Sequence, residues 1–228
     1  MDKTKIRDAA TIILIRDRDT NPRILMGQRG AKAAFMPNKY VFPGGAVDEA
    51  DSTIPLGLPL DALNNARLTE HSTRPANALA IAAIRELCEE TGQILGTPAD
   101  WSDAPSNWAP FAHLGLRPDA SSLQFIFRAV TPAGRPRRFD ARFFMADATG
   151  LATNPDDFSA AEDELSHLHW VPLKDARALD LPFITEVVLA EVSARLSQNN
   201  PTQSVPFFRN DDEAHLVTRL NGASPLGD

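Results

Sequence analysis

The sequence predicts an α/β fold in which helices cover a mixed β-sheet. Three observations predict it: apolar runs of strand length, two long amphipathic helical patterns between them, and no break in composition. With 43% hydrophobic residues, the 228-residue chain can bury a sizeable core. We expect one domain over residues 1–228, with an insertion at about residues 52–74 and a helical and hairpin extension at about residues 180–228.

The first elements are predicted to be strands. Residues 9–17 and 21–29 are rich in Ile, Leu and Met and enclose a polar turn, so we expect them to form a hairpin. Residues 39–51 begin as a short strand and run into a Pro-Gly-Gly turn.

The strongest helical pattern of the chain follows an irregular excursion. Residues 52–74 have weak periodicity, so we expect an excursion with one short helix. Residues 75–92 then form the long helix, with Pro75 in its first turn and Gly92 just past its end.

The second half of the chain alternates strands and helices after an irregular connection. The remaining predicted elements are strands at 123–130, 141–147 and 166–173, a short helix at about 173–179, an amphipathic helix at 183–196 and a terminal hairpin at 205–220.

Composition excludes several classes of protein. The longest apolar runs are far shorter than the roughly 20 residues that span a bilayer. The first residues lack the apolar region of a secretory signal, and the last residues match no retention or lipidation address. A net charge of −7 is the wrong sign for a general grip on a nucleic-acid polymer. A single cysteine, Cys88, fits a reducing compartment, so we expect a cytoplasmic protein that binds neither membranes nor nucleic-acid polymers.

The long predicted helix ends in the acidic segment RELCEETG. At about 100° per residue, its three glutamates share an arc of roughly 100°, opposite the apolar side chains that face the core. The glutamates are Glu86, Glu89 and Glu90, and the apolar side chains are those of Ile81, Ile84, Leu87 and Cys88.

This cluster is unfavourable unless a cation compensates it. Like charges three and four residues apart cost about 0.2–0.5 kcal/mol per pair, and acids at a helix C-terminus cost about 0.3–1 kcal/mol each. Three hard oxygen donors favour Mg²⁺ or Mn²⁺ over zinc, and the five histidines lack zinc-ligand spacing. A solvated helix face is the alternative.

At this point the residues resemble the Nudix box, whose pattern joins a glycine, an acid and the helix segment. Arg85, Glu86, Leu87, Glu89, Glu90 and Gly92 fill its second half, with Ile94 one place beyond its apolar position. Gly45 and Asp51 fill the first half, with Asp in place of Glu. Between Asp51 and Arg85 lie 33 residues, so the box is split by an insertion. The resemblance implies a Nudix-type α/β/α sandwich.

Three features resemble the Nudix subfamily that includes a peroxisomal coenzyme A diphosphatase. They are the split box and the segments FMPNKYVFPGGAVDEAD and TPAGRPRRFDARFF. The segment ILMGQRG keeps Arg29 of that subfamily's upstream signature but not its Thr or Ser. The resemblance implies a Mg²⁺- or Mn²⁺-dependent hydrolase that cleaves the diphosphate of a nucleoside diphosphate linked to another group, CoA or acyl-CoA being one candidate. Another nucleotide diphosphate (ADP-ribose, NADH, a dinucleotide) and a non-catalytic ligand-binding module remain the alternatives.

The resemblance also implies roles for individual residues. Glu86, Glu89 and Glu90 would hold the metal ions together with the Gly45 carbonyl, and one glutamate would also orient water. Arg85 would pair with Asp51, and members of the family often form homodimers.

Two further predictions concern the substrate and the general base. Glu164, in an acidic loop before a strand, is our candidate base, with a solvated loop as the alternative. Arg29 at a strand end is the candidate phosphate ligand, together with Arg138 from a basic cluster whose alternative is a solvated hairpin tip. The other members of that cluster are Arg135, Arg137 and Arg142. Phe35, Tyr40, Trp101 and Trp108 are more simply core residues than base-stacking ones.

Overall fold

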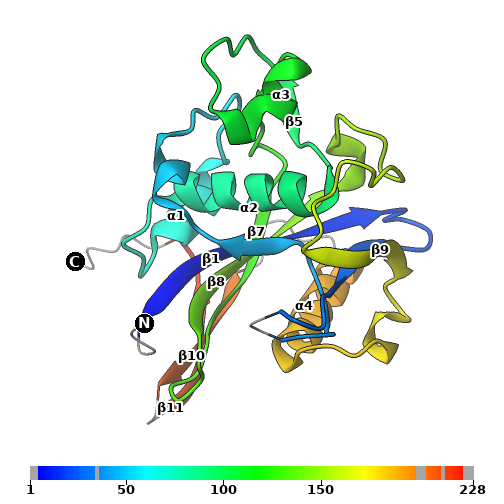
Figure 1. The fold of residues 1–228 in the computed structure, drawn as a ribbon. Coiled ribbons are helices and arrows are strands. Elements are labelled where there is room, and N and C mark those ends of the chain that lie inside the picture. Colours follow the sequence, from blue (N-terminus) through cyan, green and yellow to red (C-terminus); the bar gives the residue numbers. More distant parts are fainter. Residues whose placement is uncertain (1–4, 34–35, 199–203, 212–213, 223–228) are drawn as a thin grey trace.

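The computed structural model describes residues 5–33, 36–198, 204–211 and 214–222. In that part of the chain, a nine-stranded sheet runs in the order β11-β10-β7-β8-β1-β2-β3, with β4 also paired to β1 and β9 to β2 (Figure 1). Its strands are β1 (Ile6–Arg16), β2 (Arg23–Arg29), β3 (Tyr40–Val41), β4 (Gly44–Ala46), β7 (Gln124–Val130), β8 (Arg138–Asp147), β9 (Leu165–Pro172), β10 (Val205–Asp211) and β11 (Ala214–Leu220).

The sheet is mixed, as predicted. The long strand β1 pairs in parallel with β8 from Ile6↔Arg138 to Ile15↔Asp147, and β10 pairs in parallel with β7. The other pairs are antiparallel, including the predicted hairpin of β1 and β2.

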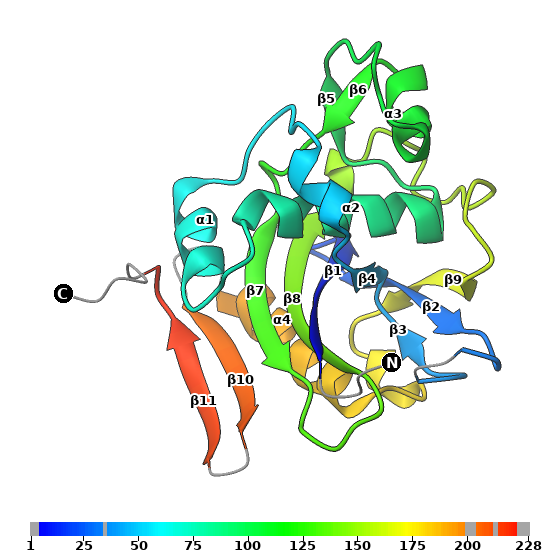
Figure 2. The same cartoon turned by 60° about the vertical axis from the view of Figure 1, so that its left-hand side comes forward.

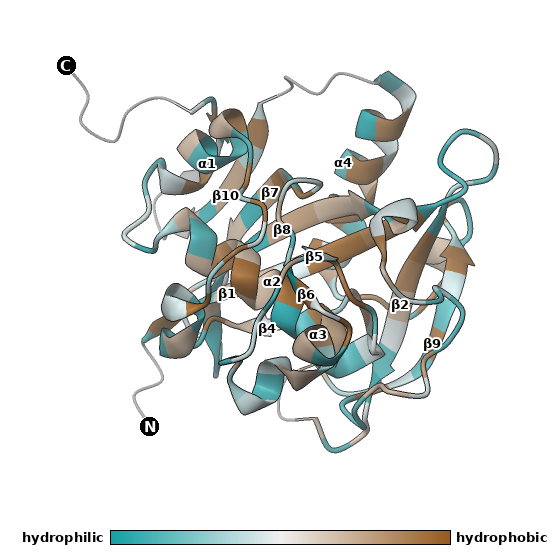
Figure 3. Cartoon of the chain, turned by 90° about the horizontal axis from the view of Figure 1, so that it is seen from above, coloured by the Kyte–Doolittle hydropathy of each residue, from teal (hydrophilic) through white to brown (hydrophobic). Residues whose placement is uncertain are grey.

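Helices cover both faces of the sheet. The helix α2 (Ala76–Thr91) packs on one face and α4 (Phe183–Gln198) on the other, and Figures 1 and 2 show them on opposite sides of the strands. Two hydrophobic clusters result, one under each helix. Figure 3 shows hydrophobic colouring concentrated along the strands and α2, and hydrophilic colouring in the peripheral loops. The α/β/α sandwich predicted from the sequence is therefore confirmed.

The ends of α2 follow the sequence signals. Gly92 adopts a left-handed conformation (φ 72°), and its N–H donates to the Cys88 carbonyl oxygen at 2.8 Å. A residue with a Cβ is strained there, so glycine ends the helix. Pro75 lies just before the first turn rather than within it.

The predicted excursion contains the short helix α1 (Ala62–Thr69), after the 3₁₀ turn η1 (Glu49–Thr53). Asp61 caps α1 by accepting a hydrogen bond from the Asn64 N–H at 2.8 Å.

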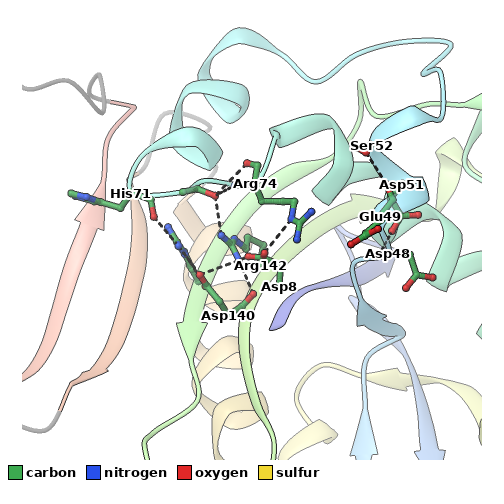
Figure 4. A network of polar contacts seen from close by, with 11 residues as sticks. Asp8, Asp48, Glu49, Asp51, Ser52, His71, Arg74, Asp140 and Arg142 are labelled. Atoms are coloured by element: carbon green, nitrogen blue, oxygen red, sulfur yellow. Dashed lines mark hydrogen bonds and ion pairs between the residues drawn. The ribbon is translucent and has the colours of Figure 1, made fainter. Parts of the chain in front are cut away.

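A buried arginine fixes this excursion to the sheet (Figure 4). Arg142 is 1% exposed, and its guanidinium donates to Asp8 Oδ1 at 2.6 Å and to Ser72 Oγ at 3.0 Å. The Asp140 carboxylate forms an ion pair with Arg142 at 3.1 Å and accepts a hydrogen bond from Arg128 at 2.7 Å. Arg142 is therefore a structural residue and not part of an exposed basic cluster.

Several segments are more regular or more divided than predicted. The connection expected to be irregular contains a small second sheet, and the aromatic side chains of Trp101, Trp108 and Phe111 pack together in the same segment. Pro43 separates β3 from β4, and the predicted short helix near residue 173 is only a 3₁₀ turn. The remaining elements are β5 (Gly96–Pro98), η2 (Ser106–Trp108), α3 (Ala109–His113), β6 (Leu116–Pro118), η3 (Ala148–Gly150) and η4 (Ala176–Ala178).

The C-terminal hairpin predicted from the sequence is present as β10 and β11. It extends the sheet past β7, with Phe207 beside Arg128 in the register. The Glu70 carboxylate accepts hydrogen bonds from the backbone N–H groups of Asn221 and Gly222, both at 2.9 Å. The hairpin is thereby joined to the excursion.

Candidate active site and metal centre

The acidic end of α2 lies against β4. Glu90 is 2% exposed and accepts a hydrogen bond from the Gly44 N–H at 2.7 Å. Glu86 and Glu89 both accept from Arg85 Nη1, at 2.9 and 2.8 Å. Glu86 and Glu90 therefore lie against the Gly-Gly segment, and Arg85 holds Glu89 beside Glu86.

Arg85 connects the two halves of the split motif. Its Nε donates to Asp51 Oδ1 at 2.9 Å and its Nη2 to Asp51 Oδ2 at 3.2 Å, a bidentate pair. Nη2 also donates to the Ala46 carbonyl oxygen at 3.0 Å, and both side chains of the pair are buried. The structure thus contains the Arg85–Asp51 pair that the resemblance implied, across the insertion.

At about 100° per residue, Arg85 lies about 100° from Glu86 but only about 40° from Glu89, its i,i+4 neighbour. In the structure its long side chain reaches both Glu86 and Glu89. The positive charge that the cluster was expected to need is supplied in part by the protein itself.

Burial raises the pKa of all three glutamates. The pKa of Glu86 rises to about 7, chiefly because burial disfavours its charged form, although Arg85 opposes the rise. The pKa of Glu89 is raised and that of Glu90 raised well above its ordinary value, in both cases mainly by burial. Neighbouring carboxylates add to each shift. Arg85 therefore compensates the cluster incompletely.

Gly45 makes room for one of these carboxylates. A Cβ atom built on Gly45 would lie 2.5 Å from the Glu86 carboxylate, closer than atoms can approach. Only glycine therefore allows the carboxylate to lie this close to the backbone of β4.

These residues fit a divalent metal by donor type and by space. All the donors are hard oxygens, as Mg²⁺ and Mn²⁺ prefer, and Gly45 leaves the approach open. Glu86 Oε2 and Glu89 Oε1 have no hydrogen bond within the described residues. No three or more His, Cys, Asp or Glu side chains of that part of the chain are already arranged as a metal cluster, since Arg85 holds two of the carboxylates.

A cavity of about 1030 Å³ opens beside this site. It brings together four of the predicted residues, which line one region of its wall: Gly45, Glu86, Arg29 and Glu164. Arg29 Nη2 and Glu164 Oε1 form an ion pair at 2.9 Å. Because the Glu164 charge also raises the pKa of Glu86, the candidate base and the acidic cluster lie close together.

The other predicted side chains lie elsewhere. Arg138 does not line this cavity, and its Nε donates to the Thr131 carbonyl oxygen at 3.1 Å. Its neighbours Arg135 and Arg137 do line the cavity. Trp101 and Trp108 are buried in the core, as expected, and Tyr40 contacts His169 edge to face. Phe35 lies outside the described residues.

Sequence reasoning did not anticipate two parts of the cavity wall. Phe183, at the start of α4, and Phe208, on β10, both line it. The strand and helix patterns around them gave the elements but not their position against the sheet. The sequence signal for Phe183 was an aromatic residue directly after Pro182, at the start of a predicted helix, and the structure leaves this side chain exposed.

Two known proteins are similar to this chain in sequence. The protein named "Putative nudix hydrolase 7" of Caenorhabditis elegans is 30% identical over 182 residues, covering 74% of this chain and 52% of that protein. The acyl-coenzyme A diphosphatase NUDT19 of Gallus gallus is 29% identical over 230 residues, covering 72% and 60%. The chain thus spans little more than half the length of these curated relatives.

A solved structure agrees in fold and in sequence. The crystal structure of a NUDIX hydrolase from Alicyclobacillus acidocaldarius superposes with a TM-score of 0.65 at 28% identity, covering 86% of this chain and 97% of that one. No protein-family profile matches the chain. The chain is thus similar in sequence to proteins named as Nudix hydrolases, and it shares the fold of the NUDIX hydrolase from Alicyclobacillus acidocaldarius.

Proposed function

We propose that the protein is a Mg²⁺- or Mn²⁺-dependent hydrolase of a nucleoside diphosphate linked to another group. One observation carries this proposal: Glu86 at the acidic end of α2 meets Gly45, Arg29 and Glu164 at the wall of one large cavity. Such a site can hold a polyanionic substrate only with added positive charge, which Arg29 and a metal would supply.

The metal ligands would be Glu86, Glu89, Glu90 and the Gly45 carbonyl oxygen. When bound, the metal would screen the phosphates and lower the pKa of a coordinated water. Arg85 and Asp51 would position the helix end against β4, since they bridge the two halves of the motif. Arg85 is therefore a positioning residue.

Arg29 and Glu164 suggest how the substrate prepares the base. Without substrate they neutralise each other at 2.9 Å. A substrate phosphate is a better bidentate partner for a guanidinium, so its binding would release the Glu164 carboxylate. The released carboxylate, close to Glu86, would accept the proton of the attacking water.

CoA or acyl-CoA is the substrate that we propose first. The split motif and the similarity to an acyl-coenzyme A diphosphatase support it. ADP-ribose, NADH and dinucleotides are the competing substrates, and a ligand-binding module without turnover is the competing function. The three motif glutamates are all present, which favours an enzyme.

The remaining proposals concern location and partners. Within the described residues, the structure contains no helix with the length and apolar character needed for a membrane crossing. We propose a cytoplasmic protein, on the ground that its single cysteine suits a reducing compartment, and a homodimer as its assembly.

The test is an activity screen with matched variants. The protein is incubated with and without Mg²⁺ on CoA, acyl-CoA, ADP-ribose, NADH and diadenosine polyphosphates, and products are identified by mass. CoA should give 3′,5′-ADP and phosphopantetheine. Glu89→Gln and Glu90→Gln should each lower turnover by roughly 100-fold or more while the far-UV spectrum is unchanged.

The exposed Glu49 provides a control of the same chemistry, and Glu49→Gln should retain wild-type turnover. Full activity of both motif variants, or turnover without any divalent ion, would refute the metal assignment.

A further inference from the structure

The floor of the cavity is a row of alanines that crosses four neighbouring strands. In the strand registers Ala46 of β4 lies beside Ala9 of β1, Ala9 beside Ala141 of β8, and Ala141 beside Ala129 of β7. Phe208 of β10 ends the row. All five residues line the cavity. At about 4.8 Å per strand, the row extends over roughly 19 Å.

This row makes a shallow, flat surface, because no side chain in it before Phe208 extends past Cβ. An aromatic residue stands over the same cavity. Phe183 is 77% exposed although it is a large apolar side chain, and it lines the cavity from the start of α4, the helix that covers this face of the sheet. A flat apolar floor with an accessible aromatic ring suits a planar heteroaromatic base.

Charge is segregated along the cavity wall. The two acids that line it, Glu86 and Glu164, lie at the metal-site region together with Arg29. Three arginines line it where the β7–β8 loop meets the sheet. Arg135 and Arg137 are in the loop, and Arg7 is on β1, where its register partner on β8 is Phe139. None of these three forms an ion pair within the residues that the structure describes.

A fourth arginine near the same place is not available for a ligand. Arg209 lines the cavity, but its guanidinium lies 4.7 Å from the centre of the Phe207 ring. Phe207 and Arg209 are two residues apart on β10 and share the face opposite to Phe208. The cationic region is therefore that of Arg7, Arg135 and Arg137, which we call the loop arginines.

We propose that this part of the cavity binds the nucleoside of the substrate, and that this nucleoside carries a phosphate additional to the diphosphate. The base lies on the alanine floor under Phe183, and the additional phosphate contacts the loop arginines. The inference rests on the proposed function and narrows its substrate class. A protein of net charge −7 that gathers three arginines at one cavity wall is built for an anion there.

The test compares substrates that differ only in this phosphate. The kcat/KM values of the full-length protein are measured on CoA and on dephospho-CoA with Mg²⁺. We expect a preference for CoA of about tenfold or more, the usual effect of losing hydrogen bonds to a charged group. In the double variant Arg7→Gln/Arg137→Gln the preference should fall to within about threefold, through loss of activity on CoA alone.

Two further variants separate the base from the phosphate. Phe183→Ala should lower kcat/KM on both substrates by the same factor and leave their ratio unchanged. Arg177→Gln removes an exposed arginine outside the cavity and should change neither value. Equal kcat/KM for CoA and dephospho-CoA in the wild type, or equal losses on both in the double variant, would overturn the proposal.

The test also separates this inference from the function on which it rests. If no diphosphate is hydrolysed, the proposed function fails, and calorimetry with adenosine 3′,5′-bisphosphate and AMP then tests the cavity directly. Tighter binding of the bisphosphate, lost in the double variant, supports the nucleoside assignment. Equal affinities contradict it.

Discussion

At the scale of single residues, Glu86 combines an unfavourable environment with a functional position. Burial raises its pKa to about 7, while Gly45 lets its carboxylate lie against the backbone of β4. A group whose pKa is higher in the folded than in the unfolded state destabilises the fold once it is ionised. The ionised Glu86 carboxylate is therefore less unfavourable with a cation bound beside it than in the metal-free protein.

This predicts a pH-dependent stability of the metal-free protein. The neutral form of Glu86 makes its full contribution to the free energy of unfolding below about pH 4.5. This contribution is lost as the pH rises through about 7 and Glu86 ionises. Glu86→Gln should therefore be more stable than the wild type at pH 8, by on the order of 1–3 kcal/mol, and equal to it near pH 4.5. Urea unfolding in EDTA at the two pH values measures this difference.

The same experiment contains its own controls. Glu49→Gln, at an exposed position, should show no such pH dependence. Added Mg²⁺ should raise the melting temperature of the wild type more at pH 8 than at pH 5, because protons compete with the metal for the carboxylates. A Glu86→Gln variant that is less stable than the wild type at pH 8 would contradict the argument.

At the scale of elements, β4 is a three-residue strand that positions the acidic helix end. It pairs with β1 through Gly44–Ala46, donates the Gly44 N–H to Glu90 and accepts from Arg85 at the Ala46 carbonyl. Because successive side chains of a strand point to opposite faces of the sheet, Ala46 lies in the alanine floor. One short strand therefore contributes to the proposed metal site and to the cavity.

Gly45→Ala tests this positioning. The added Cβ would meet the Glu86 carboxylate at 2.5 Å, and since that carboxylate ends a flexible side chain, it should move while the strand stays in place. We expect turnover to fall by about tenfold or more and the melting temperature to change little. Gly150→Ala, whose added Cβ meets only ordinary contacts, should retain both.

The elements and the acidic cluster were predictable because their signals are local. The long helix, its glycine stop and the β1–β2 hairpin follow from periodicity and turn residues within short windows. The alanine floor was not predictable, because it depends on the registers of β1, β4, β7 and β8, which lie far apart in the sequence. The contact of Arg85 with Glu89 could have been predicted from their i,i+4 spacing. Its contact with Glu86 could not, because helical angles describe Cα positions and not the reach of a long side chain.

At the scale of the whole molecule, the C-terminal hairpin completes the sheet. Without it, β7 would be an edge strand with unpaired backbone groups. Phe207 of β10 is 3% exposed, and the Arg128 guanidinium lies 4.2 Å from the centre of its ring. The hairpin therefore belongs to the folded core although it comes last in the sequence.

Phe207→Ala should accordingly destabilise the protein by about 3–5 kcal/mol, the usual cost of emptying a buried phenylalanine site. Equilibrium urea unfolding measures it. Phe183→Ala, which removes the same side chain from an exposed position, should change the free energy of unfolding by less than about 0.5 kcal/mol. Similar losses in the two variants would show that the hairpin does not contribute to the core.

Arg85 has a consequence for how the protein folds in the absence of a metal ion. Since its guanidinium already joins Asp51, Glu86 and Glu89, the polypeptide can finish folding during synthesis without waiting for a metal. If the proposed metal binds, its removal by a chelator should leave a folded protein that can bind the ion again without unfolding.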